Sequence, residues 1–331
     1  MEKILGIGNA LVDVMTIIDN DIVLEKFALP KGSMQIVDKN KSELVKSGTK
    51  DLKRSLASGG SAANTIHGLA MLGLETGYIG SIGKDDIGDF FERDLKNAHI
   101  NTFLLRRDSP TGTAIALVSP DSERTFATHL GAAVEMEAAD LNPDDFRNFQ
   151  ILYIEGYQIT NKPLVVKACQ IAKENNMKIA LDLASYNVVE AFLSDFKEII
   201  EKYVDIVFAN EEEAKSFTGM APEDSLNSIS KLCEVAVVKV GSEGSWIKRG
   251  EEVVRIGTPK VKVKDTTGAG DLYASGFLYG YSKNQNLELC GQYGSILAGN
   301  VIEIVGARMS QDRWDKIRKS ISKIESSEIA D

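Results

Sequence analysis

The chain has 331 residues, of which 43% are hydrophobic and 26% are charged, and its net charge is −10. This composition is ordinary for a soluble globular protein, and the negative charge argues against a nucleic-acid partner, which needs clustered Lys and Arg. No apolar run approaches the roughly 20 residues of a membrane helix, and the N-terminus lacks the pattern of a signal peptide. The few cysteines and histidines lack the spacing of a disulfide framework, a zinc site or a Ser-His-Asp site. We therefore expect a cytoplasmic protein without a membrane partner.

The first half of the chain mixes strand and helix patterns with two stretches of another kind. The regular patterns are a strand at 3–8, a helix from Gly59-Gly60 to Leu72, a strand at 78–82 and a helix at 86–97. The two other stretches, at about 13–56 and 101–130, contain only short alternating segments. Such segments, joined by turns, predict antiparallel strands.

From residue 150 onward, strands and helices alternate regularly. The predicted strands lie at 151–154, 178–183, 206–209 and 235–240, with a hairpin at 244–256; the predicted helices lie near 162–175, 190–202, 210–218, 222–232, 269–282 and 287–304. Regular alternation predicts a mainly parallel sheet covered on both faces. We expect one doubly wound α/β domain over residues 1–331, with a small β lid formed by about 13–56 and 101–130.

The most informative segment is Asp265-Thr266-Thr267-Gly268-Ala269-Gly270-Asp271. It follows the strand-like residues 261–263 and leads into a helix. At a helix N-terminus, the small residues Gly268, Ala269 and Gly270 leave their N–H groups free to face an anion, where the helix dipole adds about half a positive charge. Asp271 could accept a proton from an attacking hydroxyl. The same residues could instead form a helix-entry turn whose carboxylate interacts with the dipole.

Two N-terminal segments place polar groups where a ligand could bind. Gly59 and Gly60, before a helix, let a ligand approach the backbone, and Asn64 offers both a donor and an acceptor one turn later. Asn9 and Asp13 follow the first strand, and ligands of open α/β sheets bind at such carboxyl ends. A carboxylate there can accept two hydrogen bonds from a vicinal diol. Paired glycines at a helix start are also common for packing alone.

Together these segments resemble the PfkB/ribokinase family over residues 3–310. Gly59–Asn64 looks like its N-terminal signature, and Asp265–Asp271 looks like its C-terminal signature. The resemblance implies a ribokinase-like, Rossmann-type core with a β lid, ATP and Mg²⁺, phosphorylation of a primary alcohol and, often, activation by K⁺. It also implies that Asp271 is the catalytic base and that the residues 268–270 form the anion hole.

The resemblance implies further contacts to the nucleotide and to cations. Asn210-Glu211-Glu212-Glu213 is similar to the family's N-x-x-E motif, which puts Asn210 near the phosphates and Glu213 behind a Mg²⁺-bound water. A solvated helix face is the alternative for Glu213. Lys239, Gly241 and Gly244 would lie in the nucleotide-side loop, and Asn300 would lie beside the adenine. Asp265 and Thr267, with Gly306, would face the monovalent cation. Asp182 departs from the Asn that many members carry.

Three segments resemble adenosine kinases more than ribokinases: Gly6–Asp13, Lys31–Gln35 and Tyr153–Tyr157. This resemblance implies the 5′-hydroxyl of adenosine as the acceptor. The ribose hydroxyls would bind to Asp13 and Asn64, and the base to Gln35 and to Tyr157, which can stack on it. Two alternatives stay open: a kinase of ribose, fructose or a keto-sugar acid, and a non-catalytic nucleoside- or sugar-binding regulator. We expect a monomer or a homodimer formed through the lid.

Overall fold

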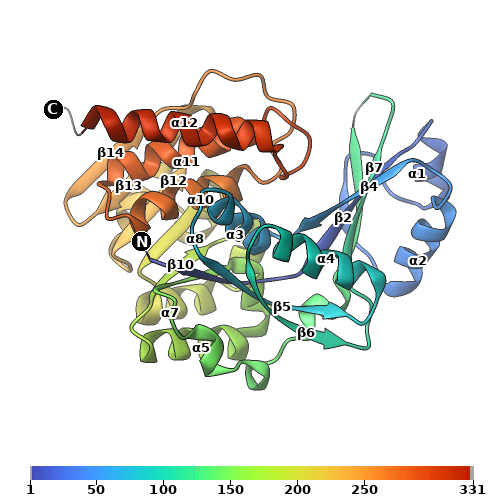
Figure 1. Ribbon diagram of the computed structural model, residues 1–331, viewed down its shortest axis with the longest axis horizontal. Coiled ribbons are helices and arrows are strands. Elements are labelled where there is room, and N and C mark those ends of the chain that lie inside the picture. Colours follow the sequence, from blue (N-terminus) through green and yellow to red (C-terminus); the bar gives the residue numbers. More distant parts are fainter. Residues whose placement is uncertain (1, 122, 329–331) are drawn as a thin grey trace.

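The computed structural model describes residues 2–121 and 123–328, and these residues form a large sheet and a small one (Figure 1). The large sheet of the described residues has nine strands in the order β14-β13-β12-β11-β10-β9-β1-β5-β6. Their bounds are β1 (Ile4–Ile7), β5 (Thr76–Gly83), β6 (Asn101–Arg107), β9 (Ile151–Glu155), β10 (Lys178–Asp182), β11 (Ile206–Asn210), β12 (Val235–Lys239), β13 (Ser245–Arg249) and β14 (Glu252–Ile256). The strands from β12 to β6 pair in parallel, and the β13–β14 hairpin adds an antiparallel edge.

Helices cover both faces of this sheet because its strands are apolar on both sides. In β1, Ile4 packs into one hydrophobic cluster, whereas Leu5 and Ile7 pack into the other, as expected when successive side chains point to opposite faces. The first face carries α3 (Ser61–Met71), α4 (Asp86–Asn97), α10 (Ala269–Ser282) and α11 (Leu287–Val301), with α12 (Gln311–Glu328) packed outside them. The second face carries α5 (Lys162–Glu174), α6 (Tyr186–Ala191), α7 (Leu193–Tyr203), α8 (Glu211–Thr218) and α9 (Pro222–Ile229).

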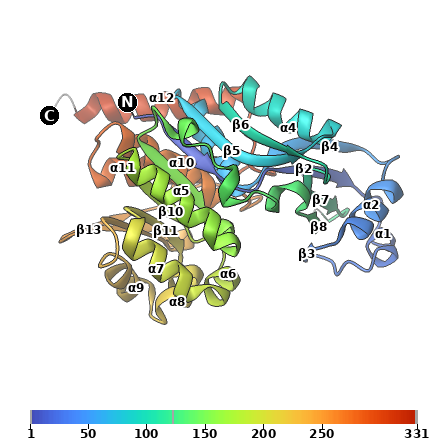
Figure 2. The same cartoon turned by 90° about the horizontal axis from the view of Figure 1, so that it is seen from below.

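The small sheet projects from one side of the large one (Figure 2). Within the described residues it has five strands in the order β3-β8-β7-β2-β4. Their bounds are β2 (Leu11–Ile17), β3 (Met34–Ile36), β4 (Arg54–Gly59), β7 (Gly112–Val118) and β8 (Arg124–His129). Two helices, α1 (Ile22–Lys26) and α2 (Lys39–Gly48), pack against it through Leu24, Phe27 and Val45.

Four expectations from the sequence are wrong in detail. The strands of the small sheet are not all antiparallel, because β2 pairs in parallel with β7 and β3 pairs in parallel with β8. Residues 101–130 do not all join the small sheet, because β6 pairs in parallel with β5. Phe91 and Leu95 bury one side of α4 against the large sheet, so that β5, α4 and β6 form a crossover unit. As an edge strand, β6 is half-exposed and therefore has the pattern of a lid strand. The stretch 13–56 contains helices as well as strands, and residues 261–263 form no strand.

The fold brings several polar residues to one edge of the large sheet. Glu155, Asp182, Asn210 and Lys239 are each the last residue of their strands, β9 to β12. Parallel strands end at the same edge, and ligands of open α/β sheets bind there. None of the helices in the described part of the chain combines the length and the apolarity needed to cross a bilayer.

Candidate active site

Asp271 lies in the first turn of α10, where two side chains of α3 hold its carboxylate. Its Oδ1 accepts a hydrogen bond from Ser61 Oγ at 2.7 Å, and its Oδ2 accepts one from Asn64 Nδ2 at 2.9 Å. Burial raises the pKa of Asp271 to about 6, although these two hydrogen bonds act in the opposite direction. The carboxylate is therefore ionised at neutral pH and is more basic than an exposed aspartate.

The backbone just before Asp271 is closely packed, and only small residues fit there. Gly268, the residue that precedes α10, has φ +75, and a Cβ there would lie 2.7 Å from the Cβ of Ala307. A Cβ at Gly270 would lie 3.1 Å from Lys239 Nζ. The N-terminus of α10 thus faces a lysine ammonium, and together they provide the positive environment that a phosphate needs.

Lys239 also connects this N-terminus to two carboxylates. Its Nζ donates to Asp182 Oδ2 at 3.0 Å. Burial alone would lower the pKa of Lys239, but the charges of Asp182 and Glu213 outweigh burial and raise it. Lys239, whose side chain is 16% exposed, is therefore held in its charged form beside the N-terminus of α10.

Asn210 and Glu213 bind each other at the start of α8. The Asn210 side chain accepts from Glu213 N, and the Glu213 carboxylate accepts from both Asn210 N and Asn210 Nδ2, each at 2.8 Å. This is a capping box. Glu213 is only 3% exposed, so the alternative of a solvated helix face is wrong. Burial, followed by the charge of Asp182, raises its pKa to about 7.

Asp13 lies on β2 against the glycine pair of the first signature. A Cβ at Gly59 would lie within 2.8 Å of the Asp13 carboxylate, and a Cβ at Gly60, whose φ is +95, would lie 2.1 Å from Asn9 O. Neither position tolerates a side chain in this arrangement. Burial raises the pKa of Asp13 to about 6; the charge of Asp271 adds to this effect, and that of Arg308 opposes it. Of the residues predicted to bind the acceptor, Gly59 thus packs directly against Asp13.

Sequence reasoning missed Glu155, a carboxylate that is 1% exposed. Its Oε1 accepts from Asn9 N at 2.8 Å, and its Oε2 accepts from Ala62 N at 2.9 Å. Burial raises its pKa to about 7 despite these hydrogen bonds. Glu155 therefore ties the loop after β1 to the start of α3. The available signal was an acidic residue at the end of an otherwise apolar strand.

The residues predicted to face a monovalent cation come together around one carboxylate. Asp265 Oδ1 accepts from Thr267 N at 2.9 Å and from Thr267 Oγ1 at 2.8 Å, and Asp265 Oδ2 accepts from Gly306 N at 2.7 Å. Arg124, which the sequence analysis did not identify, forms a two-pronged ion pair with the same carboxylate from β8.

Several predicted residues lie outside these contacts. Gln35 is exposed on β3. The Asn300 side chain donates to Ile296 O and accepts from Arg313 Nη1. Tyr157, which follows β9, is 39% exposed. Burial and the charge of Glu155 raise its pKa to about 12, and Asp182 and Asp271 contribute in the same direction.

Gly241 and Gly244 form the turn between β12 and β13. Both have positive φ, +54 and +99, and Gly244 N donates to Gly241 O at 3.2 Å. A Cβ at Gly244 would lie 1.8 Å from Ile256 O. The close approach of the hairpin backbone alone accounts for Gly244.

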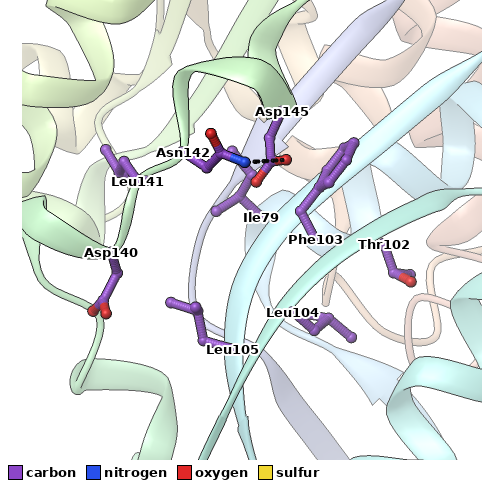
Figure 3. Close-up of a pocket in the computed structure, with 9 residues that line it drawn as sticks. All are labelled: Ile79, Thr102, Phe103, Leu104, Leu105, Asp140, Leu141, Asn142 and Asp145. Carbon is purple, nitrogen blue, oxygen red and sulfur yellow. Dashed lines mark hydrogen bonds between the residues drawn. The ribbon is translucent and has the colours of Figure 1, made fainter.

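A separate surface pocket of about 260 Å³ lies between β6 and the 3-10 turns at 138–146 (Figure 3). Its lining comprises Ile79, Thr102, Phe103, Leu104, Leu105, Asp140, Leu141, Asn142 and Asp145. None of the residues predicted from the sequence to bind substrate or nucleotide lines it.

Comparison with known proteins gives one family and several related activities. Residues 35–314 match the family model "pfkB family carbohydrate kinase". The adenosine kinase from Sinorhizobium meliloti superposes with a TM-score of 0.85 at 34% identity, covering 96% of this chain and 99% of that one. A "Nucleoside kinase" of Methanocaldococcus jannaschii is 29% identical over 327 residues, which are 98% of each chain. A "5-dehydro-2-deoxygluconokinase" of Bacillus subtilis is 30% identical over 261 residues, 74% of this chain and 80% of that protein.

These similarities confirm the family and the ribokinase-like fold predicted from the two signatures. The family model spans far more than half of the chain. The relatives include nucleoside and sugar kinases, so that the activity is phosphoryl transfer to an acceptor of one of these two classes. The chain therefore belongs to the PfkB family of carbohydrate kinases and is a phosphotransferase.

Proposed function

We propose that this kinase transfers the γ-phosphoryl group of ATP to the 5′-hydroxyl of adenosine, with Asp271 accepting the hydroxyl proton. One observation carries the proposal. Each oxygen of the Asp271 carboxylate receives one hydrogen bond from α3, and the same residue lies at the N-terminus of α10. A carboxylate that can act as a base thus lies beside a helix N-terminus that can attract an anion, an arrangement that suits phosphoryl transfer.

The proposed step is a direct transfer. The acceptor oxygen forms a bond to the γ-phosphorus, the bond from that phosphorus to the leaving diphosphate breaks, and the hydroxyl proton passes to Asp271. Ser61 and Asn64 fix the orientation of the carboxylate. Lys239 and the N–H groups at the start of α10 favour the negative charge on the transferring group.

The residues near Lys239 fit Mg²⁺ bound together with ATP. Asp182 and Glu213 supply the oxygen donors that Mg²⁺ prefers. The pKa of Glu213 is raised first by burial and then by the charge of Asp182, and a bound cation would lower it. Within residues 2–121 and 123–328, no three acidic, His or Cys side chains are arranged to hold a metal. Mg²⁺ usually keeps several waters, so that one or two protein carboxylates are enough to hold it. When bound, it would neutralise charge on the phosphates.

Contacts near Asp13 support a ribosyl acceptor. Asp13 is an enclosed carboxylate beside Gly59, which suits two hydroxyl donors. Asn64 Oδ1 is buried and has no hydrogen-bond partner among the described residues, so it can accept from a sugar hydroxyl. The S. meliloti adenosine kinase and the M. jannaschii nucleoside kinase support the choice of a nucleoside.

A sugar kinase is the second candidate, and two observations favour it. The B. subtilis relative acts, by its name, on an acidic keto sugar. The guanidinium of Arg308 is coupled electrostatically to Asp13, and its Nη1 is buried without a hydrogen-bond partner in the described part of the chain. Such a cation suits a substrate carboxylate. The retention of Asp271 beside Lys239 supports catalysis over a binding-only regulator.

The test is ADP release with a panel of nucleosides, ribose, fructose and keto-sugar acids. We expect the highest kcat/KM with adenosine. Asp13→Ala should cost about 1–3 kcal/mol of transition-state stabilisation with any ribosyl acceptor. Tyr157→Ala should lose about 1–3 kcal/mol of base stacking with adenosine and far less with ribose. If a free sugar or sugar acid is phosphorylated far better than every nucleoside, the adenosine proposal is wrong.

Quaternary structure and location stay predictions. Apolar side chains exposed on the small sheet include Ile17, Met34, Ile36 and Leu56, and they suit a homodimer formed there as well as they suit contacts with a nucleoside base. Sedimentation of the purified protein would distinguish the predicted homodimer from the monomer.

A further inference from the structure

We propose that the guanidinium of Arg124 takes the place of the monovalent cation expected beside Asp265, so that this kinase needs no K⁺. The inference rests on the proposed role of residues 268–270 as the anion hole, and it is independent of which acceptor is used. Arg124 would then be a positioning residue of the small sheet that supports the anion hole through Asp265.

The first argument is that Asp265 has no room for a cation. A carboxylate offers about four lone-pair positions. Asp265 Oδ1 accepts from Thr267 N, Thr267 Oγ1 and Arg124 Nη2, whereas Oδ2 accepts from Gly306 N and, at 2.7 Å, from Arg124 Nη1. Arg124 Nη2 also lies 3.2 Å from Thr267 Oγ1. Asp265 and Thr267, the two residues predicted to face K⁺, are thus both in contact with one guanidinium.

The second argument is charge. K⁺ and a guanidinium each carry one positive charge, so the exchange preserves the electrostatic support of the anion hole. The side chain of Asp265 is 2% exposed and that of Arg124 is 18% exposed. Burial would raise the pKa of Asp265, but hydrogen bonds from Arg124, Gly306 N and Thr267 outweigh burial and lower it. These contacts therefore favour the charged form of the Asp265 carboxyl.

The third argument is the position of the pair. Asp265 fixes the N–H groups of Thr267 and Gly306, which precede Gly268 and Ala307, respectively. A Cβ added at Gly268 would lie 2.7 Å from the Cβ of Ala307, so that these two residues pack tightly beside the anion hole. Arg124 begins β8, and its guanidinium lies 5.6 Å from the ring of Phe126 on the same strand. The small sheet thus provides the charge that orders the anion-hole loops.

The salt dependence of the wild-type enzyme gives the first test. Turnover and ADP affinity are measured in choline, Na⁺ and K⁺ chlorides at matched ionic strength, so that screening is equal. We expect the same values in all three salts. Activation of the wild type by K⁺ alone would overturn the inference, whatever acceptor is used. Absence of adenosine phosphorylation in every salt would instead contradict the adenosine proposal, and ADP affinity would still report on K⁺.

The variant Arg124→Met gives the second test because it keeps most of the side-chain length without the charge. It leaves a buried carboxylate unpaired, and we expect a loss of about tenfold or more in kcat/KM in choline chloride. K⁺ should restore activity and raise the melting temperature of this variant, whereas choline should do neither. Arg106→Met, which removes an arginine of β6 that pairs with Asp89 and Glu92, is the matched control and should not respond to K⁺.

A purely structural ion pair gives the opposite pattern. In that case Arg124→Met loses activity and stability, and K⁺ restores neither, which would overturn the inference. Asp265→Asn provides a check that does not depend on Arg124→Met folding. Without the carboxylate there is nothing for K⁺ to neutralise, so we expect its activity to be low and its melting temperature to be unaffected by K⁺. A K⁺-dependent rescue of Asp265→Asn would contradict the role given to this carboxylate.

Discussion

The side-chain amide of Asn64 donates from Nδ2 to Oδ2 of Asp271 across 2.9 Å, although the two residues are 207 positions apart in the chain. This hydrogen bond joins α3, which begins at the first signature, to α10, which begins at the second. Ser61, one turn earlier on α3, donates to the other oxygen. The two family signatures therefore meet at a single carboxylate.

Asn64→Asp should move the pH dependence of catalysis. A second carboxylate beside Asp271 disfavours ionisation of the pair and raises the apparent pKa of the base. We expect the acid limb of the kcat/KM profile to shift to higher pH. The control is Asn101→Asp, which adds the same charge at an exposed position of β6. An unchanged profile in Asn64→Asp would contradict the contact between Asn64 and the base.

The wild-type enzyme should lose activity as the pH falls through about 6. Asp271 must be ionised to accept a proton, and its pKa is raised from 3.8 to about 6, mainly by burial. A profile of kcat/KM against pH with saturating ATP measures this ionisation. If activity is constant down to the ordinary pKa of an aspartate, Asp271 is not the group that limits catalysis.

Asp271→Asn should be at least as stable as the wild type at neutral pH. The folded-state pKa lies above the unfolded value, so between the two values the folded protein binds more protons, and the free energy of unfolding decreases as the pH rises through about 6. An uncharged Asn avoids this effect. The melting temperatures of the two proteins at neutral and at acidic pH measure this difference in stability. A clearly lower melting temperature of the variant at neutral pH would contradict the prediction.

Glu155→Gln should weaken acceptor binding more than ATP binding. An amide can accept only one of the hydrogen bonds from Asn9 N and Ala62 N without placing its NH₂ group against a donor. The resulting unsatisfied group should cost about 1–3 kcal/mol. We expect a higher KM for the acceptor, a nearly unchanged KM for ATP and lower stability. Glu75→Gln, at an exposed position that pairs with Lys3, is the control. A change in the KM for ATP alone would contradict this role.

The small sheet should act as a lid over the acceptor. On addition of acceptor we expect slower amide exchange in β2, β3, β4, β7 and β8, with little change in the strands of the large sheet. Strand β6 is the internal control. It lies within residues 101–130, which the sequence assigned to the lid, but it belongs to the large sheet. Equal protection of β6 and the small sheet, or no protection in either, would show that the lid proposal is wrong.

The regular α/β half of the chain could be predicted from the sequence because each element buries a continuous apolar face. Helix α4 and the strands from β9 to β12 have the predicted bounds to within two residues. Edge elements were harder to place. Strand β6 is only partly buried, so its pattern resembles that of a small separate sheet, and its partner β5 could not be inferred from local residues. Val263 is β-branched and therefore suggested a strand. In the structure its side chain is 57% exposed, and residues 261–263 form no strand.

The candidate site also contains some residues whose roles the sequence predicts and others whose roles it does not. The backbone requirements of Gly60 and Gly268 were readable because a positive φ favours glycine. The roles of Arg124, Glu155 and Arg308 depend on partners more than 90 positions away, and no spacing in the sequence encodes those distances. Asn210 and Glu213 form a capping box at a spacing that serves either a helix start or a phosphate site, so the motif alone could not distinguish the two.

The turnover of purified Asp271→Asn tests the central claim most directly. The variant keeps the size of the side chain and the N-terminus of α10, and it removes the negative charge, one acceptor oxygen and the capacity to take the proton. We predict that ATP binds with unchanged affinity and that kcat falls by about 10²–10⁴-fold, the usual contribution of a positioned general base. Near-normal turnover in a variant that binds ATP normally would contradict the assignment of Asp271 as the base.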